Sequence, residues 1–192
     1  MRKIKLVGLC GSLRKQSSNS IVLQTLSAEL LSTDMTLSIH ALNDIPLYNA
    51  DLDGETPPSE VRRLREAVSS ADGLVIASPE YSHSMSGVIK NALDWLSPID
   101  RPSPLKGKPV LTITASPAFF GGSTAQHQLS EALYAVRANL INIPQMVITE
   151  VSSKIRDNRL VDQETRATLV EAMGALHNAA TESMQSSTLI WA

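Results

Sequence analysis

Four short apolar runs rich in β-branched residues punctuate the chain, at residues 4–8, 73–78, 110–115 and 146–149. Their apolar residues are nearly continuous and are bounded by Gly, Pro or Ser. This pattern is typical of strands buried on both faces of a parallel sheet. A fifth segment, residues 36–40, alternates apolar and polar residues, which predicts a strand nearer the sheet edge.

Helical patterns fill the intervals between these runs. Apolar residues recur at three- and four-residue spacing over residues 22–31, 61–71, 88–96, 125–140 and 165–180. Strands that alternate with helices in this way predict right-handed crossovers and a doubly wound α/β sheet. No repeat or convincing linker divides the chain, so we expect one domain over residues 1–192, with residues 43–58 as a long surface connection.

Composition removes several classes of partner. The chain is 43% hydrophobic and 19% charged, with a formal net charge of -2, which gives no electrostatic reason to expect nucleic acid or anionic lipid. No segment approaches membrane-spanning length and no signal peptide is recognisable, so we expect a soluble, cytoplasmic protein. The single Cys10 excludes an intrachain disulfide, and no Cys/His cluster has the spacing of metal ligands.

The loop after the first predicted strand, residues 8–20, indicates a phosphate site. Open parallel sheets bind ligands beyond the carboxyl ends of their strands, and this loop leads directly into a helix whose N-terminal N–H groups attract anions. Neutral donors come from Ser12, Ser17, Asn19 and Ser20. Arg14 adds a fixed charge with a planar pair of donors. The alternative is that Ser17 or Ser18 only caps the helix, with Arg14 solvated.

The spacing in this loop excludes several known phosphate motifs. Gln16 stands where a Walker A loop requires glycine, and Gly8 and Gly11 do not form the Gly-x-Gly of a dinucleotide fingerprint. Arg14 follows Cys10 after four residues, where a phosphatase loop wants about six. A monophosphate cradle remains, which is what a mononucleotide needs.

Two further loops are expected at the same sheet edge. In residues 78–87, Tyr81 could stack on a planar heterocycle beside backbone and hydroxyl donors, although Ser84 or Ser86 could simply cap a helix there. In residues 115–123, small residues would let the backbone approach a ring closely, and the pair Gly121–Gly122 suggests positive φ or tight contact. The two phenylalanines of the chain, Phe119 and Phe120, also lie in this loop and suggest a binding surface or subunit contact, with simple loop packing as the alternative.

On these residues the chain resembles the NADPH-dependent FMN reductase family, in particular the branch of small flavin reductases that act on quinones and chromate. The motifs that carry the resemblance are Gly11-Ser12-Leu13-Arg14-Lys15 with Ser17 and Asn19, Pro79-Glu80-Tyr81-Ser82, Asp94-Trp95-Leu96-Ser97, Leu105-Lys106-Gly107-Lys108-Pro109-Val110 and Gly121-Gly122. The match extends from about residue 3 to about residue 149. It implies a flavodoxin-like five-stranded parallel sheet of order 2-1-3-4-5, with helices on both faces.

The resemblance also implies a set of cofactor contacts. The FMN phosphate would be held by Ser12, Arg14, Ser17, Asn19 and Ser20. The isoalloxazine ring would be bordered by Pro79, Glu80, Tyr81, Ser82 and His83, with Ser116 near its other edge. Relatives form dimers or tetramers with FMN near a subunit interface. Thr124 stands where many carry an arginine that serves assembly, which puts the tetramer in doubt.

The implied activity is an NAD(P)H oxidoreductase. A nicotinamide would stack on FMN and pass it a hydride, and a quinone, flavin or similar small molecule would then take the electrons in a ping-pong sequence. This chemistry requires no catalytic side chain of the protein. Arg101 is the one arginine suggested for the 2′-phosphate of NADPH. The alternatives are a flavodoxin-type electron carrier, which would usually be more acidic, and a phosphate-binding regulatory domain without flavin.

Overall fold

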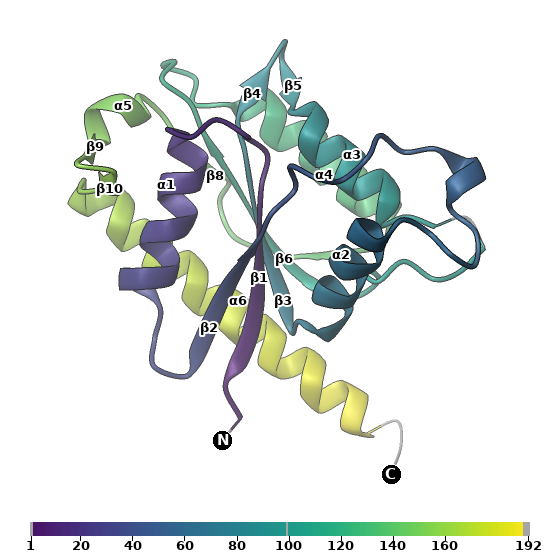
Figure 1. Ribbon diagram of the computed structural model, residues 1–192. Helices are drawn as coiled ribbons and strands as arrows, with labels where there is room; N and C mark the ends of the chain where they lie inside the picture. The colour runs from purple at the N-terminus through teal and green to yellow at the C-terminus, as the bar shows by residue number, and fades with distance from the viewer. Residues whose placement is uncertain (1, 99, 190–192) are drawn as a thin grey trace.

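The structure is a computed structural model that describes residues 2–98 and 100–189, so the ends of the expected 1–192 domain and residue 99 lie outside the described residues. Its centre is a parallel sheet in which β2 (Met35–His40), β1 (Ile4–Cys10), β3 (Gly73–Ser78) and β6 (Pro109–Ala115) lie side by side in that order (Figure 1). The alternating segment forms β2 at the sheet edge, as predicted.

Helices cover both faces of this sheet (Figure 1). On one face α1 (Ser18–Thr25), its π-helical continuation η1 (Leu26–Leu30) and α6 (Gln163–Leu189) bury Val22, Leu26, Leu169 and Met173 against Leu6 and Val75. On the other face α2 (Ser59–Ser70), α3 (Gly87–Trp95) and α4 (Ser123–Ala135) bury Leu64, Ile89 and Leu129 against Val7 and Leu74. The strands are apolar on both sides because both sides are covered.

The direction of winding reverses between β1 and β3. The α1 crossover leads from β1 outward to β2 on one face, whereas α2 leads back past β1 to β3 on the other. Loops that follow β1 and β3 therefore diverge at the carboxyl edge of the sheet, where parallel α/β proteins bind their ligands. The doubly wound architecture and the strand order are as predicted.

The fifth position of the sheet departs from the prediction because two short strands share it. Both β7 (Asn139–Leu140) and β8 (Met146–Ile148) pair with β6. The predicted helix over residues 125–140 was too long, since α4 ends at Ala135 and Arg137 adopts a φ of 59°. Leu140 consequently belongs to a strand and pairs with Val110.

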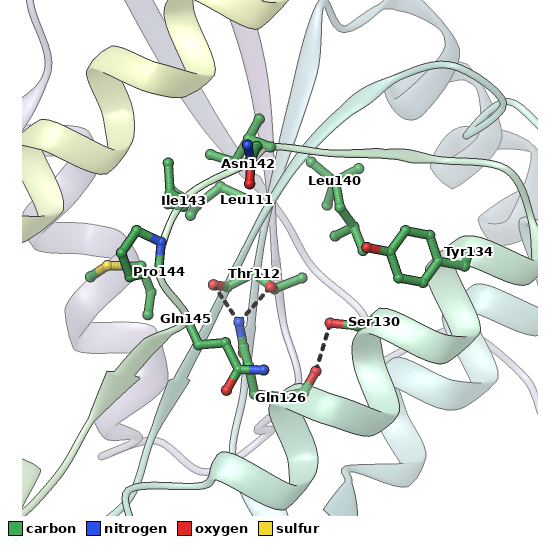
Figure 2. A pocket seen from close by; sticks show the side chains of 13 residues that line it. Leu111, Thr112, Gln126, Ser130, Tyr134, Leu140, Asn142, Ile143, Pro144 and Gln145 are labelled. Atoms are coloured by element: carbon green, nitrogen blue, oxygen red, sulfur yellow. Dashed lines mark hydrogen bonds between the residues drawn. The ribbon is translucent and has the colours of Figure 1, made fainter.

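A cavity of about 400 Å³ opens where β7 and β8 are interrupted (Figure 2). Leu111 and Thr112 of β6 face the five residues 141–145, which leave the sheet. The side-chain Nε2 of Gln126 donates to the carbonyl of Thr112 at 3.1 Å, and so replaces a missing strand hydrogen bond. This cavity has no charged lining residue and lies halfway along the sheet edge, away from the switch point.

Smaller elements occupy two further segments of the described chain. The long connection after β2 contains the short 3-10 helix η2 (Ala50–Leu52). Residues 150–163, whose pattern predicted little, form α5 (Val151–Lys154) and the hairpin of β9 (Ile155–Arg156) and β10 (Arg159–Leu160). Asp157 and Asn158 both have positive φ, as the two-residue type I′ turn of a hairpin requires.

Candidate functional site

The loops after β1, β3 and β6 meet around a cleft of about 280 Å³ at the carboxyl edge of the sheet. Each loop supplies three lining residues, which are Arg14, Ser18 and Asn19, then Pro79, Glu80 and Tyr81, then Ala115, Ser116 and Pro117. The cleft therefore brings together six of the sequence-predicted site residues. Ser18, Ala115 and Pro117 were not predicted as lining, although each is the immediate neighbour of a residue that was.

Tight packing at Gly11 brings the loop after β1 close to the residues that follow β3. A Cβ atom at this position would lie 2.5 Å from Ser86 Oγ and 2.7 Å from Ile89 Cγ1. Only glycine leaves room for the chain to turn here against α3 and Pro79. The Gly-Ser-Leu-Arg motif thus begins with a packing requirement.

Two of the predicted phosphate ligands are engaged within helix α1. Ser17 is buried and is the N-cap, its Oγ accepting from the backbone N–H of Ser20 at 3.3 Å. The Oγ of Ser20 accepts from Gln24 Nε2 at 3.2 Å. Both residues lie at the start of α1 but do not line the cleft, so capping is the role that the structure shows for Ser17.

Two other predicted ligands keep free polar atoms. Ser12 Oγ and Asn19 Oδ1 are buried and have no hydrogen-bond partner within the described part of the chain. The amide Nδ2 of Asn19 donates to the carbonyl of Ala115 at 3.0 Å, which fixes the start of α1 to the end of β6. Buried polar atoms without partners are uncommon and costly, so these atoms are suited to a bound group.

Arg14 supplies the positive charge of the cleft. Its side chain is exposed at the rim, and no ion pair is recorded for it among residues 2–98 and 100–189. A guanidinium without a carboxylate partner beside a helix N-terminus is suited to an anion.

The loop after β3 folds into a hairpin of β4 (Glu80–Tyr81) and β5 (Ser84–Met85). Ser82 and His83 form its turn with φ of 49° and 58°, and they stand outside the cleft lining. Tyr81 borders the cleft and is 49% exposed. Ser86, one of the two alternatives weighed from the sequence, caps α3 by accepting from the N–H of Ile89.

The loop after β6 forms the opposite wall. Ser116 donates its N–H to the carbonyl of Ile148 at 3.1 Å and accepts at Oγ from the N–H of Ala118. Gly121 and Gly122 have φ of 62° and 94°, and a Cβ on Gly121 would lie 2.6 Å from Val147 Cγ1. The positive φ and tight contact expected of this glycine pair are both present.

Burial raises the pKa of the Cys10 thiol at the end of β1, which disfavours the reactive thiolate. Within the described residues, no group of three His, Cys, Asp or Glu side chains could hold a metal ion. Among the same residues, no helix has the length and apolar character needed to span a membrane.

Comparison with known proteins agrees with this geometry. The model of the NADPH-dependent FMN reductase family matches residues 4–152. The chain is 37% identical over 176 residues to an NAD(P)H-dependent FMN reductase of Pseudomonas aeruginosa, which covers 90% of this chain and 93% of that protein. It is 38% identical over 166 residues to a quinone reductase of Escherichia coli, covering 85% and 88% respectively.

A solved structure shows the same arrangement. FerB of Paracoccus denitrificans, a flavoenzyme NAD(P)H:(acceptor) oxidoreductase, superposes with a TM-score of 0.84 at 28% identity, covering 94% of this chain and 98% of that one. The fold is therefore flavodoxin-like, as the resemblance implied. With the family model matching from the first strand to α5, the chain belongs to the NADPH-dependent FMN reductase family.

Proposed function

We propose that the cleft holds FMN with its phosphate at the start of α1 and its ring between the β4–β5 hairpin and the loop after β6. The observation that carries this assignment is the pair of unpartnered polar groups in the cleft lining, Asn19 Oδ1 and the guanidinium of Arg14, together with the unpartnered Ser12 Oγ buried in the same loop. A cation, an amide and the aromatic Tyr81 thus line one cleft, and FMN has a phosphate, a ribityl chain and a planar ring to match them.

The chemistry of these donors fits each part of the cofactor. Arg14 and the hydroxyl of Ser12 can donate to phosphate oxygens, together with the first N–H groups of α1. The Oδ1 of Asn19 can accept from a ribityl hydroxyl. Tyr81 and Pro117 offer apolar surface to a planar ring. For Ser12, Ser17, Ser20, Ser82 and His83, which do not line the cleft, a contact with FMN remains a sequence-based proposal.

Family membership makes the chain an FMN-dependent oxidoreductase with NAD(P)H as electron donor. Bound FMN supplies the redox chemistry, accepting a hydride from the nicotinamide and releasing electrons to a second substrate. The residues of this chain then bind, orient and shield the reactants. We assign no side chain as catalytic acid or base. We propose that backbone N–H groups near Glu80–His83 stabilise negative charge on the reduced ring.

We propose a quinone as the electron acceptor. Support comes from the Escherichia coli quinone reductase at 38% identity and from the exposed aromatic edge of Tyr81, which suits a planar, apolar molecule. The acceptor would follow the nicotinamide on the same face of FMN, so the two substrates bind in turn. Free flavin and metal oxyanions such as chromate are alternative acceptors for the same face.

The test combines reconstitution with steady-state kinetics. Purified protein loaded with FMN should be yellow, should be bleached by NADPH or NADH without oxygen, and should regain its colour on addition of a benzoquinone. Double-reciprocal plots of initial rate against nicotinamide concentration, measured at several fixed quinone concentrations, should be parallel lines, as expected for ping-pong kinetics. If neither nicotinamide bleaches the loaded protein, the chain is an electron carrier of the flavodoxin type.

We further propose that one domain over residues 1–192 acts in the cytoplasm as a homodimer or homotetramer. The free thiol of Cys10 suits a reducing compartment. Phe119 and Phe120 beside the cleft are 75% and 74% exposed, with their rings edge to face at 5.5 Å. Exposed adjacent aromatics of this kind are typical of subunit contacts.

Replacing both phenylalanines by serine should convert the oligomer toward monomer. Burying each ring contributes about 1.5–3 kcal/mol to a contact, and a two-fold symmetric interface contains each ring twice. Sedimentation velocity at several protein concentrations measures the change. The matched control is Tyr134→Ser, an exposed aromatic on α4 outside the cleft. An unchanged mass for the double variant, or an equal loss with Tyr134→Ser, would remove this loop from the interface.

A further inference from the structure

Helix α4 begins without a local cap. Its N-cap position is Gly122, which has no side chain, and φ there is 94°. The first N–H groups of a helix have no partner within the helix and need one from elsewhere. For the N–H of Ala125, the third helical residue, that partner comes from a different loop.

The partner is the carboxylate of Glu80. Glu80 Oε2 accepts from the backbone N–H of Ala125 at 3.0 Å, across 45 residues of sequence. A Cβ on Gly122 would lie 3.6 Å from the Cβ of Glu80, so the start of α4 and Glu80 lie close together. The negative charge also faces the positive end of the α4 dipole, which strengthens the bond.

This bond joins the two walls of the cleft. Glu80 belongs to the hairpin after β3, and α4 continues from the loop after β6 that carries Ser116 and Pro117. The side chain of Glu80 is 20% exposed and forms part of the cleft lining, whereas Oε2 is engaged with α4. The other oxygen, Oε1, lies 3.5 Å from Nδ1 of His83, on the exposed turn of the hairpin.

We propose that Glu80 is a positioning residue that sets the separation of the two cleft walls by capping α4. It thereby fixes the width of the space in which the flavin ring binds. This inference rests on the proposed placement of FMN. It gives Glu80 a role different from a direct contact of its carboxylate with the ring. What matters is that an acceptor oxygen reaches the N–H of Ala125, and the negative charge is secondary.

Three variants of Glu80 distinguish the effect of an acceptor oxygen that reaches the Ala125 N–H from the effect of the negative charge. Glu80→Ala removes the acceptor, Glu80→Gln retains an acceptor oxygen at the same length, and Glu80→Asp retains the charge on a shorter stem. Glu131→Ala, which removes an exposed carboxylate from the same helix, is the matched control. Thermal unfolding identifies any variant that does not fold, and the comparison of Glu80→Gln with Glu80→Asp then still decides the question.

The measurements are riboflavin and FMN binding, and hydrogen exchange of the Ala125 amide in the protein without added flavin. Glu80→Ala and Glu80→Asp should weaken both ligands by the same factor, about tenfold for the loss of one charged cap. The Ala125 amide should exchange faster in both variants. Glu80→Gln should bind both ligands within about threefold of the parent, and Glu131→Ala should match the parent in both measurements.

The contrary outcomes are specific. Rescue by Glu80→Asp and not by Glu80→Gln would show that charge matters instead of reach, and unchanged exchange at Ala125 in Glu80→Ala would show that no cap was lost. Either result overturns the inference. If the parent protein itself does not bind FMN, the proposed function fails, and exchange at Ala125 still reports separately on the cap.

Discussion

Arg14→Ala should weaken FMN binding by about 30- to 140-fold and leave riboflavin binding unchanged. Hydrogen bonds from a guanidinium to a phosphate are charge-assisted, and losing them costs about 2–3 kcal/mol. Arg14 is exposed at the cleft rim and no ion pair is recorded for it in the described chain, so its removal should not disturb the fold. Riboflavin lacks the phosphate and should not detect the change.

Quenching of flavin fluorescence on titration gives both dissociation constants. Lys15→Ala, which removes the adjacent exposed cation, is the control and should change FMN affinity by less than threefold. Arg14→Lys should fall between parent and Arg14→Ala, because lysine keeps the charge and loses the paired donors. If Arg14→Ala retained FMN as tightly as the parent, or lost riboflavin equally, the phosphate would lie elsewhere in the cleft.

The central sheet could be predicted from sequence because burial on both faces leaves a local signature. The apolar run of β3 shows it, since each residue from Gly73 to Ser78 is buried. At the fifth position β8 left this signature in the apolar run 146–149, whereas β7 left none. Asn139 and Leu140 form a strand only through pairing with Pro109 and Val110, and the apolar spacing of Leu140 also continues the helical pattern of α4. Tertiary pairing decides such short strands.

At the site, the sequence located the loops better than the roles within them. Ser17 and Ser18 illustrate why, because a hydroxyl at a helix start can cap the helix or bind a phosphate with the same chemistry. The structure assigns the cap to Ser17 and leaves Ser18 in the cleft. The bond from Glu80 to Ala125 could not be predicted, since it depends on the distance between two loops 45 residues apart.

The long connection after β2 hides a second contact of this kind. Asp53, whose side chain is 2% exposed, pairs at 2.7 Å with Arg65 of α2 and at 2.7 Å with Arg101. Arg65 also donates to the carbonyl of Trp95, at the end of α3. Arg101, suggested from sequence for the 2′-phosphate of NADPH, is instead bound to Asp53 and the carbonyl of Gly54. The long surface connection is thus fixed to α2 and α3.

Asp53→Ala should lower the free energy of unfolding by about 3–5 kcal/mol, because it leaves the half-buried Arg65 without its counter-charge. Urea unfolding followed by circular dichroism measures the loss. Arg101→Ala is the matched control and should cost at most about 1 kcal/mol, since Arg101 is 40% exposed. None of the three residues lines the cleft, so riboflavin affinity of the folded protein should be unchanged.

The double variant Asp53→Ala/Arg65→Ala tests the cause of that loss. Removing Arg65 as well takes away the uncompensated charge. The double variant should therefore lose less free energy of unfolding than the two single variants lose together. A favourable coupling of at least about 1 kcal/mol is expected between Asp53 and Arg65, and a smaller one between Asp53 and Arg101. Two outcomes would contradict this account: the losses of Asp53→Ala and Arg65→Ala could simply add in the double variant, or Asp53→Ala could cost no more than Arg101→Ala. Either would mean that the connection after β2 is stabilised by its apolar contacts and not by this buried charge.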